Sequence, residues 1–135
     1  MYNEKYMEIA LNEAVKAFKK GEVPVGAVIV KNNKIISKAY NKIEKNNDAT
    51  AHAEIIAIKK ASKKIKNWRL NGCDLYVTLY PCDMCLGAII QSRIDNIYYI
   101  LDKNNNIKKN VNFNQIKKYN GYYLKLIKNF FKNKR

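Results

Sequence analysis

The side chains best suited to chemistry lie in two short motifs. The chain has one histidine, His52, in the sequence Ala-His-Ala-Glu, and a Pro-Cys-x-x-Cys motif follows at residues 81–85. Cys82 and Cys85 are three residues apart, so on a helix they share one face of a single turn. One imidazole and two thiolates form a ligand set that suits zinc. The spacing therefore predicts a zinc site made by His52, Cys82 and Cys85.

Such a site is expected to be catalytic. Three protein ligands leave the fourth tetrahedral position open for water, whose pKa zinc lowers from about 15.7 to about 7. Glu54 follows His52 by two residues, near enough to take the proton of that water and pass it to a leaving group. Both motifs are expected at helix starts, where the helix dipole lowers the pKa of a thiol. The pattern favours a hydrolytic enzyme.

Each motif alone also has an ordinary explanation. A lone histidine is usually a packing or surface residue, and a Cys-x-x-Cys pair can be redox-active or half of a structural zinc site. A structural site would need a fourth Cys or His. The remaining cysteine, Cys73, comes just before an expected strand and is interpreted as a small buried hydrophobe. The combination with Glu54 favours the catalytic interpretation.

The elements that must position the motifs alternate between helix and strand. Apolar periodicity predicts helices at 2–20, 52–64 and 82–91 and strands at 25–30, 34–40, 74–78 and 96–100. Asn32-Asn33 tolerates the positive φ of a tight hairpin. In the helix at 52–64, the residues expected on the buried side are Ile55, Ile56 and Ile58. The resulting order, α–β–β–α–β–α–β, predicts an α/β domain whose mixed sheet is sandwiched by helices.

Length and charge limit the class of protein. A chain of 135 residues suits one domain spanning 1–135. No apolar stretch approaches the ~20 residues of a membrane span, and the charged first residues do not form a secretory signal. We therefore expect no membrane association and a cytoplasmic location. The net charge of +15 permits a nucleic-acid partner. However, Lys, Asn, Ile and Tyr are all abundant, and their codons are rich in A and T, so the base composition of the genome would also raise the lysine content.

Residues 101–135 form a basic segment of different composition, with a net charge of +9. Asn and Lys make up eleven of the sixteen residues at 103–118, which is typical of a solvated loop. The apolar residues of this stretch fit either a strand or a short helix: Ile107, Val111, Phe113 and Ile116. Helical spacing returns at 119–133. We expect this segment to be a divergent part of the same domain.

His-x-Glu followed by Pro-Cys-x-x-Cys is the signature of the zinc nucleobase deaminases. Over residues 2–100 the chain resembles one branch of them, the bacterial tRNA-specific adenosine deaminases. The matching segments are 22–28, Asn41, 48–54, 75–79, 81–85, 87–90 and 92–94. Phe130-Phe131 resembles part of the final helix of that family.

The resemblance implies a cytidine-deaminase-like, three-layer α/β/α fold with a five-stranded sheet, assembled as a homodimer with one zinc ion per subunit. It implies conversion of adenosine to inosine at the wobble position of a tRNA anticodon, with Glu54 as the proton shuttle. Asn41 would hydrogen-bond the base, and Ala53 would offer its backbone at the same pocket. The basic C-terminal helix would lie along the anticodon stem-loop.

Three features depart from the family pattern. Tyr80 stands where Glu is usual, Ala49 stands where Pro is usual, and residues 100–118 lack the usual loop with Gly and Ser. These departures spare the ligands and Glu54 and concern the geometry of the substrate loops. Two alternatives stay open: a deaminase of a free base or nucleoside such as guanine or cytidine, and a catalytically silent RNA-binding subunit. The basic tail favours the tRNA enzyme, and Glu54 argues against a silent subunit.

Overall fold

The computed structural model describes residues 1–102 and 112–133 of the chain. Its helices are α1 (Glu4–Lys19), α2 (Ile43–Asn46), α3 (Ala53–Ile65), α4 (Asp83–Gln91) and α5 (Asn120–Asn133). Its strands are β1 (Gly26–Lys31), β2 (Lys34–Tyr40), β3 (Cys73–Leu79), β4 (Asn96–Leu101) and β5 (Phe113–Gln115). They form one sheet in the order β2-β1-β3-β4-β5. β1 is antiparallel to β2 and β3, whereas β3, β4 and β5 are parallel, so the predicted mixed sheet is confirmed.

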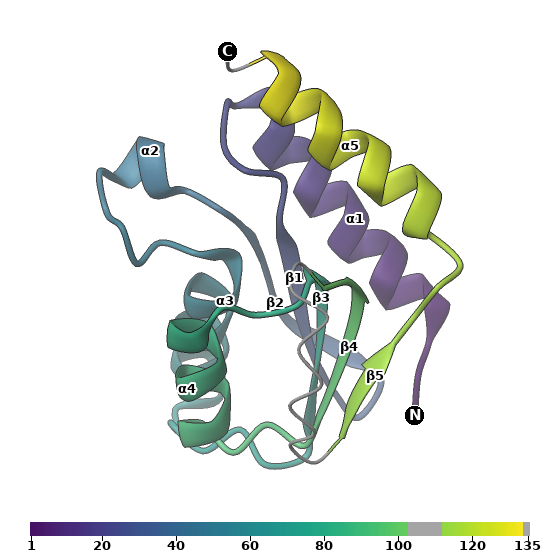
Figure 1. The fold of residues 1–135 in the computed structure, drawn as a ribbon. Helices are drawn as coiled ribbons and strands as arrows, with labels where there is room; N and C mark the ends of the chain where they lie inside the picture. The colour runs from purple at the N-terminus through teal and green to yellow at the C-terminus, as the bar shows by residue number, and fades with distance from the viewer. Residues whose placement is uncertain (103–111, 134–135) are drawn as a thin grey trace.

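The sheet is covered by helices on both faces, with α3 and α4 on one side and α1 and α5 on the other (Figure 1). Successive side chains along each strand point to opposite faces of the sheet, so they pack alternately against the two helical layers. Ala27 and Ile29 of β1 join the core beneath α3, while Val28 and Val30 join the core beneath α1 and α5. This arrangement is the α/β/α sandwich that the element order predicts.

The helices and strands predicted from periodicity are confirmed, with ends that differ by a few residues. α1 begins after Asn3, whose side-chain oxygen accepts a hydrogen bond from the Lys5 N–H at 3.0 Å. Asn32 and Asn33 both adopt positive φ, 52° and 59°, in the hairpin between β1 and β2. Cys73 is the first residue of β3 and is fully buried, in keeping with its interpretation as a small hydrophobe.

Other expectations were incomplete or wrong. The periodicity did not predict α2, because a helix of four residues is too short to show a period. The stretch that contains β5 was expected to be either a strand or a short helix, and at Phe113–Gln115 it is a strand. On α3 the buried apolar residues are Ala53, Ala57 and Ala61, whereas the isoleucines expected there are only partly buried. Small side chains let this helix approach the sheet closely and leave the larger ones at its flanks. Ile107 and Val111 lie outside the described residues.

α1 packs against β1 so closely that only glycine fits at position 26. A Cβ there would collide with the backbone oxygen of Ala10, and it would lie 2.6 Å from the Ala14 nitrogen and 2.8 Å from the Glu13 Cβ. The close contact fixes the start of β1, just after the Val23–Val25 turn. That turn forms one wall of the site described below.

α5 lies along α1 and confirms the helix expected at 119–133 (Figure 1). Its docking uses a Lys118–Glu4 ion pair of 2.6 Å and a hydrogen bond of 2.8 Å from the Tyr119 hydroxyl to Glu8. Phe18 and Phe130 meet edge to face, with 6.3 Å between ring centroids. Among the helices of the described residues, none has the length and apolar character needed to cross a membrane.

Candidate active site

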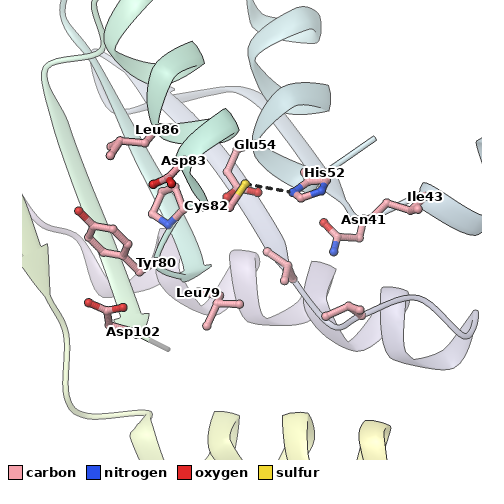
Figure 2. Close-up of a pocket in the computed structure, with 13 residues that line it drawn as sticks. Asn41, Ile43, His52, Glu54, Leu79, Tyr80, Cys82, Asp83, Leu86 and Asp102 are labelled. Atoms are coloured by element: carbon pink, nitrogen blue, oxygen red, sulfur yellow. Dashed lines mark hydrogen bonds between the residues drawn. The ribbon is translucent and has the colours of Figure 1, made fainter. Parts of the chain in front are cut away.

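The two motifs come together because each lies at the start of a helix on the same face of the sheet. His52 is the residue that precedes α3, and Cys82 is the residue that precedes α4. Both have extended backbone, with ψ of 151° and 172°, so the chain turns into the helix directly after them. Figure 2 shows the Cys82 sulfur next to the His52 ring, joined to it by a dashed line. The predicted position of both motifs at helix starts is confirmed.

The three predicted ligand residues lie together with the spacing of a metal site. His52 Nδ1 is 3.7 Å from Cys82 Sγ and 3.5 Å from Cys85 Sγ, and the three ligand atoms all lie within 4.8 Å of one another. A tetrahedral zinc ion with Zn–S near 2.3 Å and Zn–N near 2.0–2.1 Å separates nitrogen and sulfur ligands by about 3.6 Å. The chemistry and spacing of the donors therefore fit zinc.

The two cysteines differ in exposure, since Cys82 is exposed and Cys85 is buried. Burial raises the pKa of the Cys85 thiol well above its usual range, and the negative charge of nearby Glu54 raises it further. The prediction that the helix start lowers the thiol pKa is therefore wrong for Cys85. Desolvation of a buried thiolate outweighs the helix dipole. A metal cation bound by these side chains would favour the thiolate despite its burial, because coordination deprotonates a thiol outright.

Glu54 lies in the first turn of α3 and is only 3% exposed. Burial raises the pKa of its carboxyl group to about 7, although hydrogen bonds from its own backbone N–H and from the Cys85 thiol oppose the shift. A carboxyl group with that pKa can both accept and release a proton near neutral pH. Its side chain lines the same cavity as His52 and Cys82 (Figure 2).

The cavity has a volume of about 350 Å³, within the usual range for small-molecule sites. The polar residues that line it are Asn41, His52, Glu54, Tyr80, Cys82, Asp83 and Asp102, and the apolar ones are Val23, Val25, Ile43, Leu79, Pro81 and Leu86. β3 and β4 are parallel, so the residues after their carboxyl ends meet at this edge of the sheet. Ligands of open α/β sheets bind at such an edge.

Asn41 reaches the pocket, whereas Ala53 lies behind it. Asn41 is 4% exposed, and its Oδ1 accepts a hydrogen bond of 2.7 Å from the Ala53 N–H. Its own N–H donates to the Val25 oxygen at 3.2 Å. The bond to Oδ1 fixes the orientation of the Asn41 side-chain amide, so that its Nδ2 is the donor group. Ala53 is fully buried and is not among the pocket-lining residues, so it contacts the site through Asn41.

Sequence reasoning missed several pocket residues. Asp83 directly follows Cys82, so adjacency to the motif could have found it, whereas Tyr80 was noted only as a departure from the family pattern. Asp102 and Ile43 come from distant segments, and only the pairing of β3 with β4 and the short helix α2 bring them to the pocket.

Tyr80, the departure beside the motif, is accommodated by other aromatic rings. Its N–H donates to the Leu101 oxygen at 2.7 Å. Its ring lies 5.0 Å from that of Tyr99 and 5.4 Å from that of Phe113, between ring centroids. Burial, followed by the negative charge of Asp102, raises the pKa of its hydroxyl. Ala49, the other single-residue departure, is exposed in the loop after α2.

Comparison with known proteins agrees with this geometry. Residues 1–135 match the family model described as MafB19-like deaminase. A tRNA-specific adenosine deaminase of Buchnera aphidicola subsp. Schizaphis graminum is 48% identical over 142 aligned positions, which cover 96% of this chain and 94% of that protein.

Solved structures that share part of the sequence also share the fold. One comes from a study of A-to-I editing by tRNA:A34 deaminases at the wobble position of transfer RNA. It has 35% identity and a TM-score of 0.76, covering 84% of this chain and 98% of that one. Another is a guanine deaminase from Bacillus subtilis, with 29% identity and a TM-score of 0.71, covering 96% and 95% of the two chains.

Proposed function

We propose that this chain, which belongs to the MafB19-like deaminase family, converts adenosine to inosine at the wobble position of a tRNA anticodon. Its 48% identical relative is named a tRNA-specific adenosine deaminase, and a solved tRNA:A34 deaminase shares its fold. The observation that carries the proposal is a buried carboxyl group, Glu54, that lines the same cavity as His52 and Cys82, two members of a His-Cys-Cys donor set. In the net reaction, water adds at C6 of adenine and ammonia leaves.

The metal we assign to the site is one zinc ion per subunit. His52 Nδ1, Cys82 Sγ and Cys85 Sγ would hold it, as their chemistry and spacing fit a three-ligand site. When bound, zinc would supply a Lewis acid that makes water nucleophilic at neutral pH.

Glu54 is the proposed proton carrier. Its carboxylate oxygens face the cavity (Figure 2) and can take a proton from the attacking water. The same group then delivers that proton to the purine ring nitrogen. It next passes the second proton of the water, now on the hydroxyl at C6, to the amino group; the C6–N bond breaks, the C6 carbonyl forms and neutral ammonia leaves.

Asn41 is the proposed base-binding residue. Because its Oδ1 is held by the Ala53 N–H, its Nδ2 is left to donate a hydrogen bond to an acceptor on the base. Ala53 would then act by fixing the orientation of this amide. Apolar side chains of Val23, Val25 and Leu79 line the same cavity and suit the faces of a flat purine ring.

The proposed partner is the anticodon stem-loop of tRNA. Lys125, Lys128 and Lys132 of α5 are exposed, on the basic segment 101–135 of what we take to be a single domain. Lysines in such a row can neutralise backbone phosphates, and affinity would then fall steeply as salt is raised. We also propose a cytoplasmic location, because this substrate is found there.

We further propose a homodimer. Two apolar side chains of α4, Met84 and Ile90, are 40% and 45% exposed. A second copy of the chain would cover them. Light scattering should give twice the chain mass of 15.7 kDa, whereas a monomer at tens of micromolar would contradict the proposal.

A second candidate function is deamination of a free base or nucleoside. The observation that favours it is the guanine deaminase from Bacillus subtilis, whose fold covers 96% of this chain. The same donor set and Glu54 would serve that reaction. The net charge of +15 would then have no part in substrate binding.

One assay distinguishes the two candidates. Zinc-loaded protein is incubated with an arginine tRNA that has adenosine at the wobble position and, separately, with free adenosine, cytidine and guanine. We expect inosine in the tRNA and no turnover of the free compounds. Turnover of a free base or nucleoside, with unmodified tRNA, would replace the first proposal with the second.

A further inference from the structure

We infer that Tyr123 of α5 is a positioning residue that ties the two walls of the pocket together. The inference rests on the proposed function for its kinetic consequence and on the geometry for its placement. Tyr123 is fully buried, although α5 lies on the face of the sheet opposite α3 and α4 (Figure 1).

The Tyr123 hydroxyl joins three segments that are distant in sequence. It donates a hydrogen bond of 2.7 Å to the Pro24 oxygen and accepts one of 2.9 Å from Thr78 Oγ1. Thr78 Oγ1 accepts in turn from the Gly26 N–H at 3.2 Å. All three bonds are buried, where hydrogen bonds are strengthened by low dielectric and by one another.

Pro24 belongs to the wall that holds Asn41. The Val25 N–H donates to the Val23 oxygen at 2.8 Å, which closes a three-residue turn centred on Pro24. Val23 and Val25 line the cavity, and the Val25 oxygen accepts the hydrogen bond from the Asn41 N–H. Tyr123 therefore fixes the turn from which Asn41 is held.

Thr78 leads into a second wall of the cavity. The residues that follow it, 79–82, all line the cavity and end at Cys82, one of the three proposed ligands. Beyond the end of the β1–β3 ladder at Ala27 and Val77, the Tyr123 hydroxyl thus bridges the segment that holds Asn41 and the segment that carries the metal ligand.

A phenylalanine at position 123 would keep the ring but lose this link. The Pro24 oxygen would lose its buried partner, and Thr78 would lose an acceptor. Burial raises the pKa of the Tyr123 hydroxyl far above its usual range, so the group stays protonated and able to donate at any working pH. Small displacements of reacting groups can lower rates by as much as about 100-fold.

The test compares Tyr123→Phe with Tyr6→Phe. Tyr6 is also buried, and its hydroxyl also donates to a backbone oxygen at 2.7 Å, that of Asn33 in the hairpin outside the pocket. Both variants lose one hydroxyl that donates to a backbone oxygen, in a buried bond for Tyr123 and a part-buried bond for Tyr6. With zinc content equal, we expect Tyr123→Phe to lower kcat on tRNA about 10- to 100-fold, with KM within about threefold of wild type. Tyr6→Phe should leave kcat within about twofold.

Equal kcat values for the two variants would overturn the inference. Thr78 provides a second test. Thr78→Ser, which keeps the hydroxyl, should retain activity, and Thr78→Val should lose it. The double variant Thr78→Val/Tyr123→Phe should lose less activity than the product of the two single losses. Fully multiplicative losses would contradict a shared action.

Hydrogen exchange tests the placement without reference to turnover. In Tyr123→Phe, amides in segments 23–26 and 78–82 should exchange faster, and those of the 32–35 hairpin should not. Unchanged exchange in both wall segments would overturn the inference even in an active enzyme. A wild-type protein inactive on every substrate would instead contradict the proposed function.

Discussion

The starts of α3 and α4 and the C-terminal helix α5 reach the same pocket in different ways. The first region brings His52, Glu54, Cys82 and Cys85 to the site from two short motifs, each placed by the turn into its own helix. The second region reaches it through one hydroxyl, whose partners lie 99 and 45 residues away. Reactive groups are thus set by local spacing, whereas the walls that aim the substrate are set by long-range packing. Loss of a reactive group in the two motifs should abolish the reaction, whereas loss of a contact made by α5 should reduce the reaction rate or the stability of the fold.

The largest effect is expected from Cys82→Ala, which removes one of three proposed ligands. The variant should lose its zinc and all measurable turnover, because two remaining donors hold the ion too weakly. Elemental analysis of the purified protein measures this directly. Cys73→Ala is the matched control, since Cys73 is buried in β3 outside the donor cluster. A full zinc content in Cys82→Ala would show that the ligand set is wrong.

Glu54→Ala should keep zinc but lose turnover by about 10²- to 10⁴-fold. The ligands survive this change and the proton carrier does not. Zinc content and inosine formation are measured on the same sample, with Glu54→Gln as a variant of nearly equal volume. Undiminished deamination by either variant would remove Glu54 from the mechanism.

Gly26→Ala should lower the free energy of unfolding by about 3 kcal/mol. The added Cβ collides with the backbone of α1, which cannot move without opening the core. Gly121→Ala is the control, because a Cβ there meets nothing within 4 Å, and it should change stability by less than about 1 kcal/mol. Urea unfolding gives both values, and equal stabilities would refute the tight α1–β1 contact.

The smallest effect is expected from Lys118→Ala at the exposed junction of α5 and α1. Its ion pair with Glu4 is 2.6 Å long but open to solvent. Exposed pairs of this kind contribute little and are screened by salt. We expect a Tm within about 2 °C of wild type at moderate salt. A large fall in Tm would mean that surface charge, rather than buried contacts such as that of Tyr123, holds α5 in place.

The same division explains what could be predicted from sequence. The proposed ligand residues and Glu54 could be singled out because the spacing within each motif is local, and the sandwich followed from apolar periodicity and element order. Ile43 and Asp102 could not be assigned to the pocket, because a four-residue helix and the register of β3 with β4 place them there. The raised pKa of Cys85 was also missed, since the depth of burial at a helix start is set by tertiary packing. Tyr123 was visible only as one apolar position of a helix.

Zinc X-ray absorption of the purified wild-type protein shows whether the proposed metal site is open. We expect one nitrogen ligand, two sulfur ligands near 2.3 Å and one further oxygen ligand. A spectrum with three or four sulfur ligands, or with four protein ligands and no oxygen, would describe a closed structural site. That result would contradict the proposed chemistry.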